Sequence, residues 1–174
     1  MTLALIIALP FLGIFLPLLA ERLGRSACAA AAGVAPLMAL VLLLSQQSAV
    51  FSGELLKVKL EWLPALGLNL SLRLDGLGFL FALLILGIGL LVILYARYYL
   101  SKKEPMGRFF AFLLLFMGAM LGVVLSENLL LMLMFWELTS LSSFLLIGFW
   151  GSRSDARKGA RMALAITGGG GLAL

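Results

Sequence analysis

Five long runs of uncharged residues constrain most strongly what this chain can fold into. A helix needs about 20 apolar residues to cross the hydrocarbon core of a bilayer, and each run is long enough to do so. Charged residues make up 12% of the chain and cluster between the runs. The one exception is Glu137, which lies inside the last run. The runs cover residues 2–20, 26–53 (apolar through about Leu44), 76–96, 109–126 and 128–152.

The composition also indicates a membrane protein. Hydrophobic residues are 63% of the chain and the mean hydropathy is +1.16, whereas soluble domains are about half apolar. We therefore predict an all-α integral membrane protein, folded as a single membrane domain, with five full transmembrane helices and the start of a sixth. The expected spans are about 2–20, 27–44, 76–99, 109–126 and 128–150, with a sixth from 159 to beyond 174.

The sixth apolar run, from Met162 to Leu174, is too short to span a bilayer. It also lacks a terminating charge or cap. We therefore expect the polypeptide to continue beyond residue 174 and this chain to be the N-terminal part of a longer subunit.

Residues 55–75 follow a different pattern, with a period of two. Charged and apolar residues alternate from Lys57 to Trp62, and leucines alternate with polar residues from Leu68 to Asp75. This alternation is typical of a half-buried strand, and Pro64 to Gly67 between the two runs has the residues of a turn. We predict an amphipathic β-hairpin between the second and third helices. It must lie outside the hydrocarbon or pack on protein, because an open strand edge is not tolerated in lipid.

The distribution of basic residues predicts the orientation of the helices. Ten of the thirteen lie in the first, third and fifth connectors, and only Lys57, Lys59 and Arg73 lie in the other two. By the positive-inside rule the odd connectors face the cytoplasm. The N-terminus and the hairpin then face the periplasm or exterior. Because the basic residues lie in connectors rather than on one helix face, we expect lipid and not nucleic acid as a partner.

The sequence argues against metal and cofactor chemistry. It contains one cysteine, Cys28, and no histidine, which excludes an intrachain disulfide, a Cys/His metal site and a histidine general base. The glycine run from Gly168 to Gly171 follows no strand and lacks the lysine of a phosphate-binding loop. We expect these glycines to permit close helix packing instead, and we expect no metal and no cofactor.

Glu137 is the strongest candidate for a functional residue. It is the tenth residue of the 128–152 run and so lies near the middle of the membrane. A charge there costs about 2.5–3.5 kcal/mol on insertion scales, and such residues usually pair, face water or transfer protons. The alternative is a protonated acid that only forms hydrogen bonds inside the bundle. None of the apolar runs contains lysine or arginine, so a cationic partner lies beyond Leu174, in another subunit, or does not exist.

Four hydroxyl residues follow Glu137 on the same helix. Ser140 lies at i+3 from Glu137 and shares its helix face, and the others are Thr139, Ser142 and Ser143. Their hydroxyl groups either carry water along a proton path or simply allow close packing of helices.

Four charged residues near helix ends are weaker candidates for the same path. Asp75 either caps the third helix or receives ions, and Glu127 is either a solvated acid in a turn or part of the path. Topology and contact with lipid phosphate explain Lys158 and Arg161 near the start of the sixth helix without a role in the path.

Three segments resemble one known family. Residues 74–84, 113–129 and 135–150 are similar to the N-terminal region of the A-subunit of Mrp antiporters. This superfamily includes the antiporter-like subunits of respiratory complex I. The resemblance covers nearly the whole chain, including the hairpin, and Trp136-Glu137-Leu-Thr-Ser140 is its most specific part.

The resemblance implies a function and a role for Glu137. In the family, a mid-membrane glutamate on the fifth helix pairs with a lysine on a later helix, and Glu137 matches that glutamate. The implied function is a subunit of a multisubunit antiporter that exchanges Na⁺, or K⁺, for protons, with the other Mrp subunits as partners. A secondary transporter subunit of this kind is not itself an enzyme.

Two alternatives remain open from the sequence. The chain is also similar to proton-pumping membrane subunits of complex I-like oxidoreductases or membrane-bound hydrogenases. However, such relatives typically carry charges in the sixth helix, where this chain has Thr167 followed by four glycines. The second alternative is a structural membrane subunit whose buried glutamate only fixes packing.

Overall fold

The computed structural model describes residues 1–63, 68–101 and 104–172. The predicted turn from Pro64 to Gly67 and the basic residues Lys102 and Lys103 lie outside these ranges. The elements are α1 (Thr2–Gly13), α2 (Phe15–Ala20), a 3₁₀ turn η1 (Glu21–Leu23), α3 (Arg25–Leu44), α4 (Gln47–Phe51), β1 (Leu56–Leu63), β2 (Leu68–Leu74), α5 (Gly76–Tyr99), α6 (Met106–Leu125), α7 (Leu129–Ile147) and α8 (Ser154–Leu172).

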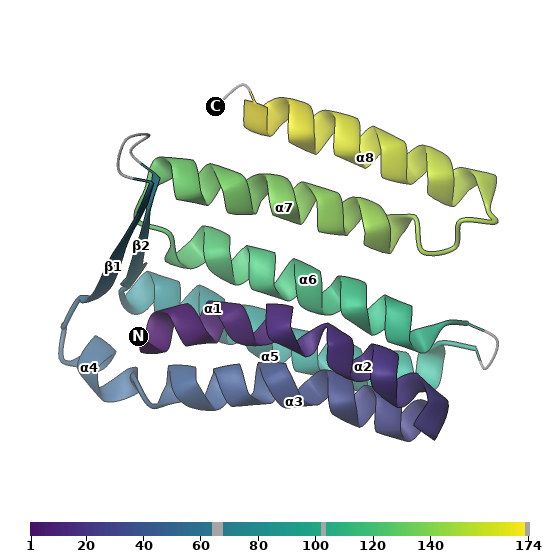
Figure 1. Cartoon of the computed structure of the whole chain (residues 1–174), viewed down its shortest axis with the longest axis horizontal. Coiled ribbons are helices and arrows are strands. Elements are labelled where there is room, and N and C mark those ends of the chain that lie inside the picture. Colours follow the sequence, from purple (N-terminus) through teal and green to yellow (C-terminus); the bar gives the residue numbers. More distant parts are fainter. Residues whose placement is uncertain (64–67, 102–103, 173–174) are drawn as a thin grey trace.

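The long helices run side by side, with the hairpin at one end of the bundle (Figure 1). Helix α6 is central and packs against α1, α3, α5 and α7, while α8 packs on α7 at one edge. Among the described residues, five helical segments are long and apolar enough to cross a membrane: Thr2–Leu23, Arg25–Leu44, Gly76–Tyr99, Met106–Leu125 and Leu129–Ile147. The predicted fold class, a helical membrane protein with a hairpin between its second and third spans, is confirmed.

The first span is interrupted, which the sequence analysis did not predict. Its hydrogen-bonded ladder breaks at Ile14, between α1 and α2, although Ile14 keeps helical dihedral angles of φ −54° and ψ −37°. Pro17 has no N–H to donate to the carbonyl of Gly13, so one helical bond is lost there. The span therefore continues as a rod with a local gap in its hydrogen bonding.

Helix α8 begins at Ser154 rather than near residue 159 as expected. Hydropathy marks where a helix enters an apolar medium, whereas the polar first turns of a helix can extend into the aqueous boundary. Asp155 lies in the first turn, where a negative charge complements the positive end of the helix dipole.

The outer surface of the bundle is apolar, as a membrane protein requires. On α5, the exposed side chains Leu84, Ile88 and Leu91 recur at helical spacing and are 43%, 56% and 65% exposed. A stripe of this kind would be unfavourable in water, but it matches contact with lipid chains.

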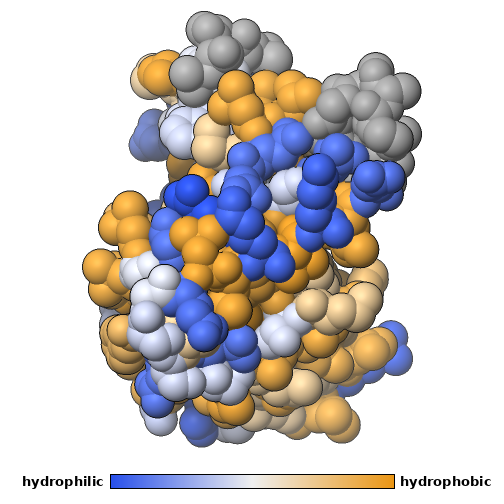
Figure 2. Space-filling model, turned by 90° about the vertical axis from the view of Figure 1, so that its left-hand side faces the viewer, coloured by the Kyte–Doolittle hydropathy of each residue, from blue (hydrophilic) through white to orange (hydrophobic). Residues whose placement is uncertain are grey.

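The hairpin packs onto the ends of the helices. Strands β1 and β2 are antiparallel, with Leu56 opposite Leu74 and Leu60 opposite Leu70. Leu72 and Leu74 are fully buried at the helix ends, and Leu72 forms an isolated bridge to Ser126 after α6. Figure 2 looks onto this end and shows a band of hydrophilic side chains across it, with hydrophobic side chains between and beside them. The hairpin thus covers the polar end of the bundle.

The opposite end carries the described residues of the odd connectors, so the basic residues gather there (Figure 1). Arg25 at the start of α3 donates to the carbonyl oxygen of Arg97 at 2.6 Å, in the last turn of α5. A cation at a helix C-terminus satisfies free carbonyls and complements the dipole. The N-terminus and the hairpin share one end, and the first, third and fifth connectors share the other.

Candidate functional site

Helix α7 carries the candidate site, and its start is fixed by a side-chain cap. The Asn128 side-chain oxygen accepts hydrogen bonds from the backbone N–H groups of Leu130 at 2.9 Å and Leu131 at 3.2 Å. From there α7 runs to Ile147, so Glu137 lies near the midpoint of the helix.

Close packing against α6 sets the rotation of α7. A Cβ atom placed on Gly122 of α6 would lie 2.6 Å from Cδ2 of Phe135, so only glycine allows the ring to sit there. Phe135 also stacks on Phe11 of α1, with ring centroids 6.4 Å apart. Residues two apart on a helix point to nearly opposite sides. With Phe135 directed at α6, Glu137 is therefore directed away from it.

The Glu137 carboxyl group lies against the glycines of α8. A Cβ atom on Gly168 would lie 3.5 Å from Oε2 of Glu137, an ordinary contact. A Cβ atom on Gly171 would overlap Oε1 of Glu137 and lie 2.9 Å from Cδ1 of Trp136. Since residues i and i+3 share a helix face, Gly168 and Gly171 together form a shallow cradle for the carboxyl group.

One oxygen of this carboxyl group is unsatisfied. Oε1 of Glu137 is buried and has no hydrogen-bond partner among the described residues. The two salt bridges found there, Lys57–Glu127 and Arg73–Asp75, do not involve Glu137. A buried, unpaired polar atom costs about 1–3 kcal/mol, and such atoms in folded proteins often mark a missing proton, water or ion.

The neighbouring hydroxyl groups are turned toward their own helix. Thr139 donates to the carbonyl oxygen of Trp136 at 2.6 Å, and Ser140, which is buried, donates to the same oxygen at 3.3 Å. Ser142 is fully buried and donates to the carbonyl oxygen of Leu138 at 2.8 Å. Ser143 is half-buried. Hydroxyl groups that bond back to the helix can bury themselves at helix interfaces without an external partner.

The structure does not bring the remaining candidates to Glu137. Asp75 caps α5, accepting from the backbone N–H of Gly78 at 2.8 Å, and pairs with Arg73 at 3.0 Å. Glu127 pairs with Lys57 of the hairpin and so joins β1 to the turn before α7. Both lie at the hairpin end of the bundle (Figure 1).

Lys158 and Arg161 are exposed on α8, at the opposite end from the hairpin. The Nε–H group of Arg161 donates to the carbonyl oxygen of Arg157 at 3.3 Å. Glu137 thus lies between two groups of charged residues, each near one end of the helices.

Sequence reasoning missed the identity of the closest neighbours of Glu137. It interpreted the glycine run as a close-packing surface but did not predict which helix would pack there. The glycine run was the available signal, because Gly168 and Gly171 within it are three residues apart and share one face of a helix. No described group of three or more His, Cys, Asp or Glu residues is arranged to hold a metal ion.

Comparison with known proteins gives two family matches. Residues 62–110 match the family described as NADH-Ubiquinone oxidoreductase (complex I), chain 5 N-terminus. Residues 126–174 match the family described as NADH:quinone oxidoreductase/Mrp antiporter, TM. The second match includes Glu137 and both glycines of its cradle.

Individual relatives are similar over most of this chain. It is 49% identical over 172 residues to the A/B-subunit of a probable K(+)/H(+) antiporter of Rhizobium meliloti (strain 1021), covering 99% of this chain and 17% of the relative. It is 52% identical over 139 residues to the A1-subunit of a Na(+)/H(+) antiporter of Staphylococcus aureus (strain JH9), covering 80% of this chain and 17% of the relative.

A solved structure shows the same similarity in three dimensions. The chain matches a chain of the Mrp complex from Dietzia sp. DQ12-45-1b with a TM-score of 0.82 and 34% identity. The match covers 99% of this chain and 18% of that chain. The present chain therefore spans about a sixth of the length of these relatives.

Proposed function

We propose that this chain forms the N-terminal part of a subunit of a cation/proton antiporter. The premise is that the chain belongs to the family of the Mrp antiporter A-subunits and the related membrane subunits of NADH:quinone oxidoreductase. The exchanged ions are protons and a monovalent cation, Na⁺ or K⁺, because the two curated relatives are named for these ions. Its partners are the other subunits of an Mrp complex, together with the remaining part of its own subunit. In this role the chain belongs to a secondary transporter and is not an enzyme.

The observation that carries this proposal is the unpaired carboxyl oxygen of Glu137. A carboxyl group at mid-membrane with a free buried oxygen can accept a proton, and it can release that proton when a cation approaches. In this proposal Glu137 is the proton acceptor and donor, and a lysine from a later helix of the subunit is its partner. Thr139, Ser140 and Ser143 support the path, or the packing around it.

Coupling requires two arrangements of this site with different free energies. Proton exchange at Glu137 drives cation movement only if ion binding elsewhere changes the balance between the two arrangements. The charged residues Asp75 and Glu127 at the hairpin end, and Lys158 and Arg161 at the other end, are the candidates for entry and exit.

We further propose that the odd connectors face the cytoplasm of a bacterial cell and the N-terminus faces outside. The support is electrostatic, because Arg22, Arg25, Arg97, Arg108 and the basic residues from Arg153 to Arg161 all lie at one end of the bundle. Basic residues near the ends of spans are retained on the cytoplasmic side.

Sodium- or potassium-dependent proton movement in everted membrane vesicles tests the proposed function. The host lacks its own antiporters and expresses the complete operon, as wild type, Glu137→Gln or Glu54→Gln. Both substitutions replace a carboxyl by an amide of the same size, but Glu54 is exposed just before β1 and has no place in the proposed path. We expect the cation to dissipate a preformed pH gradient with wild type and Glu54→Gln, and not with the assembled Glu137→Gln complex.

Other outcomes would support the alternatives. The match to complex I chain 5 favours a redox-driven proton pump as the second candidate. Proton movement that depends on an electron donor and is indifferent to Na⁺ and K⁺ would establish that candidate and refute antiport. Undiminished exchange in assembled Glu137→Gln and Glu137→Ala complexes would show that the glutamate only stabilises packing.

A further inference from the structure

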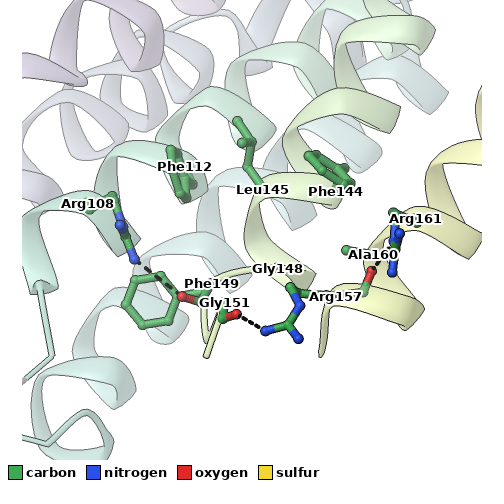
Figure 3. A pocket seen from close by; sticks show the side chains of 10 residues that line it. All are labelled: Arg108, Phe112, Phe144, Leu145, Gly148, Phe149, Gly151, Arg157, Ala160 and Arg161. Atoms are coloured by element: carbon green, nitrogen blue, oxygen red, sulfur yellow. Dashed lines mark hydrogen bonds between the residues drawn. The ribbon is translucent and has the colours of Figure 1, made fainter. Parts of the chain in front are cut away.

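A cavity of about 500 Å³ lies between the ends of α6, α7 and α8, at the end of the bundle opposite the hairpin (Figure 3). Three arginines line it: Arg108 from α6, and Arg157 and Arg161 from α8. Phenylalanines from α6 and α7 form much of the rest of the wall. The lining residues include no aspartate or glutamate, so the cavity combines positive charge with an aromatic surface.

Backbone carbonyl groups position the three guanidinium groups. Arg108 donates to the carbonyl oxygen of Phe149 at 3.3 Å, and Arg157 donates to that of Gly151 at 2.7 Å. Arg161 donates to the carbonyl oxygen of Arg157 at 3.3 Å. A guanidinium group has five N–H donors, so these bonds orient each side chain and leave donors for a ligand.

The positive charge of this cavity is not neutralised by the described residues. Carbonyl oxygens carry no formal charge, and both salt bridges found in the described residues are at the hairpin end. The acidic residues nearest in the sequence are Glu104, which accepts from the Trp150 indole, and Asp155. Neither of them lines the cavity. The arginine-lined cavity is therefore suited to an anion from outside this segment.

The aromatic wall restricts what kind of anion fits. Phe112 and Phe144 project from the membrane-spanning parts of α6 and α7, on the membrane side of the arginines (Figure 3). Free phosphate would use only the arginines, whereas a phospholipid would also place apolar carbons along the two rings. Arginine suits the phosphate, because its planar fork matches phosphate oxygens in pairs.

We propose that this cavity binds the headgroup of an anionic phospholipid, with Arg108, Arg157 and Arg161 on the phosphate and the first acyl carbons against Phe112 and Phe144. Basic cavities between transmembrane helices on the cytoplasmic side are suited to anionic headgroups. The volume is also in the range of about 300–1,000 Å³ that is usual for small-ligand sites. The lipid would fix α8 against α6 and α7 by bridging arginines from separate connectors.

The test uses the complete antiporter complex, purified in detergent as wild type, Arg157→Gln/Arg161→Gln and Arg153→Gln. Arg153 is the matched control, because it carries the same charge in the same connector but lies over the Trp150 ring at 5.8 Å and does not line the cavity. Phosphatidylglycerol that remains bound is counted by native mass spectrometry. Its affinity is then measured by titration after delipidation, against phosphatidylcholine and inorganic phosphate.

We expect wild type and Arg153→Gln to retain phosphatidylglycerol, and the double variant to bind it roughly 30-fold more weakly, from the loss of two cations. Phosphatidylcholine and millimolar phosphate should not replace it. Arg161→Gln alone provides a second variant if the double variant fails to assemble, since its described hydrogen bond is to its own helix. Equal retention in wild type and the variants would overturn the proposal, and so would full displacement by inorganic phosphate.

Discussion

Substitution of Gly171 by alanine tests directly whether the position of the Glu137 carboxyl group matters. A methyl group at residue 171 would occupy the space of Oε1 of Glu137 and lie 2.9 Å from Cδ1 of the Trp136 ring. The ring contacts the same methyl group and must shift slightly to admit it, whereas the carboxyl group is the far end of a flexible side chain and can rotate away. We therefore expect the carboxyl group to rotate away from α8 while the two helices keep their packing.

The expected size of the effect on folding and on exchange follows from the free-energy cost of overpacking. An extra methyl group in a packed interface costs about 1–3 kcal/mol, and replacing glycine by alanine within a helix recovers up to about 1 kcal/mol. The net effect on folding is small. If the original carboxyl position is the active one, its population falls by roughly 5–150-fold for the same 1–3 kcal/mol. Exchange should therefore fall much more than assembly does.

Alanine at Gly169 and at Gly170 provides matched controls. These residues lie on the same helix and gain the same helix propensity, but a Cβ atom on either has no neighbouring atom within 4 Å. The assay is cation-dependent proton movement in everted vesicles, with the amount of assembled complex measured in parallel. We expect Gly169→Ala and Gly170→Ala to match wild type and Gly171→Ala to assemble but exchange at least about five-fold more slowly. Full activity in Gly171→Ala would refute the view that the glycine cradle sets the working position of Glu137.

Three further predictions concern other parts of the chain. A membrane-impermeant maleimide applied to intact cells should label Ser52→Cys, near the hairpin, and not Ser154→Cys at the start of α8; the reverse pattern would invert the proposed orientation. The Trp150 indole N–H, together with a backbone N–H, lowers the pKa of Glu104, so their contact should persist above the ordinary glutamate pKa and be lost only as pH falls through the lowered value. Trp150 fluorescence should report this loss, and Glu104→Gln should abolish the transition. Asn128→Ala should destabilise the start of α7 by about 1 kcal/mol through loss of its cap, measured as a lower Tm of the complex.

The sequence predicted those features of the fold that depend on hydropathy. The five spans are visible because a bilayer requires long apolar runs, and the hairpin is visible because strands on a surface alternate with a period of two. Besides the start of α8, two features escaped prediction. The gap at Ile14 depends on one missing N–H at Pro17 inside an apolar run, and the short helix α4 follows Gln46 without a strong signal of its own.

The sequence predicted Glu137 but not the residues around it. Glu137 stands out because a lone acid inside an apolar run is costly, and this can be recognised from one sequence. Its contact with Gly171 depends on how α7 rotates, which is set by the Phe135 ring against Gly122. The arginine cavity was missed because Arg108 and Arg157 belong to different connectors, where each has a sufficient explanation as a topology signal.

The distribution of satisfied and unsatisfied groups indicates where this segment meets its partners. Three charged groups near α6 have partners: Arg25 bonds to the end of α5, Asp75 caps α5, and Glu127 pairs with the hairpin. On α7 and α8, in contrast, some polar and charged groups have no hydrogen-bond partner or no salt-bridge partner among the described residues. Among the described residues, a carboxyl oxygen of Glu137 is buried without a hydrogen-bond partner at mid-membrane, and no acidic residue lines the cavity that holds the three arginines.

These two unsatisfied features require partners of opposite charge, so one partner cannot serve both. The mid-membrane carboxyl group requires a proton or a cation, because an unpaired negative charge is unfavourable in the surrounding apolar medium. Exchange of a proton for a cation keeps the group neutralised throughout. The arginine cavity calls for an anion, and at a membrane surface the anion with an apolar body is a phospholipid. We therefore expect α8, whose extensive contacts among the described helices are with α7, to be held in place by both partners. Loss of the lipid should then loosen the same helix whose glycines position Glu137.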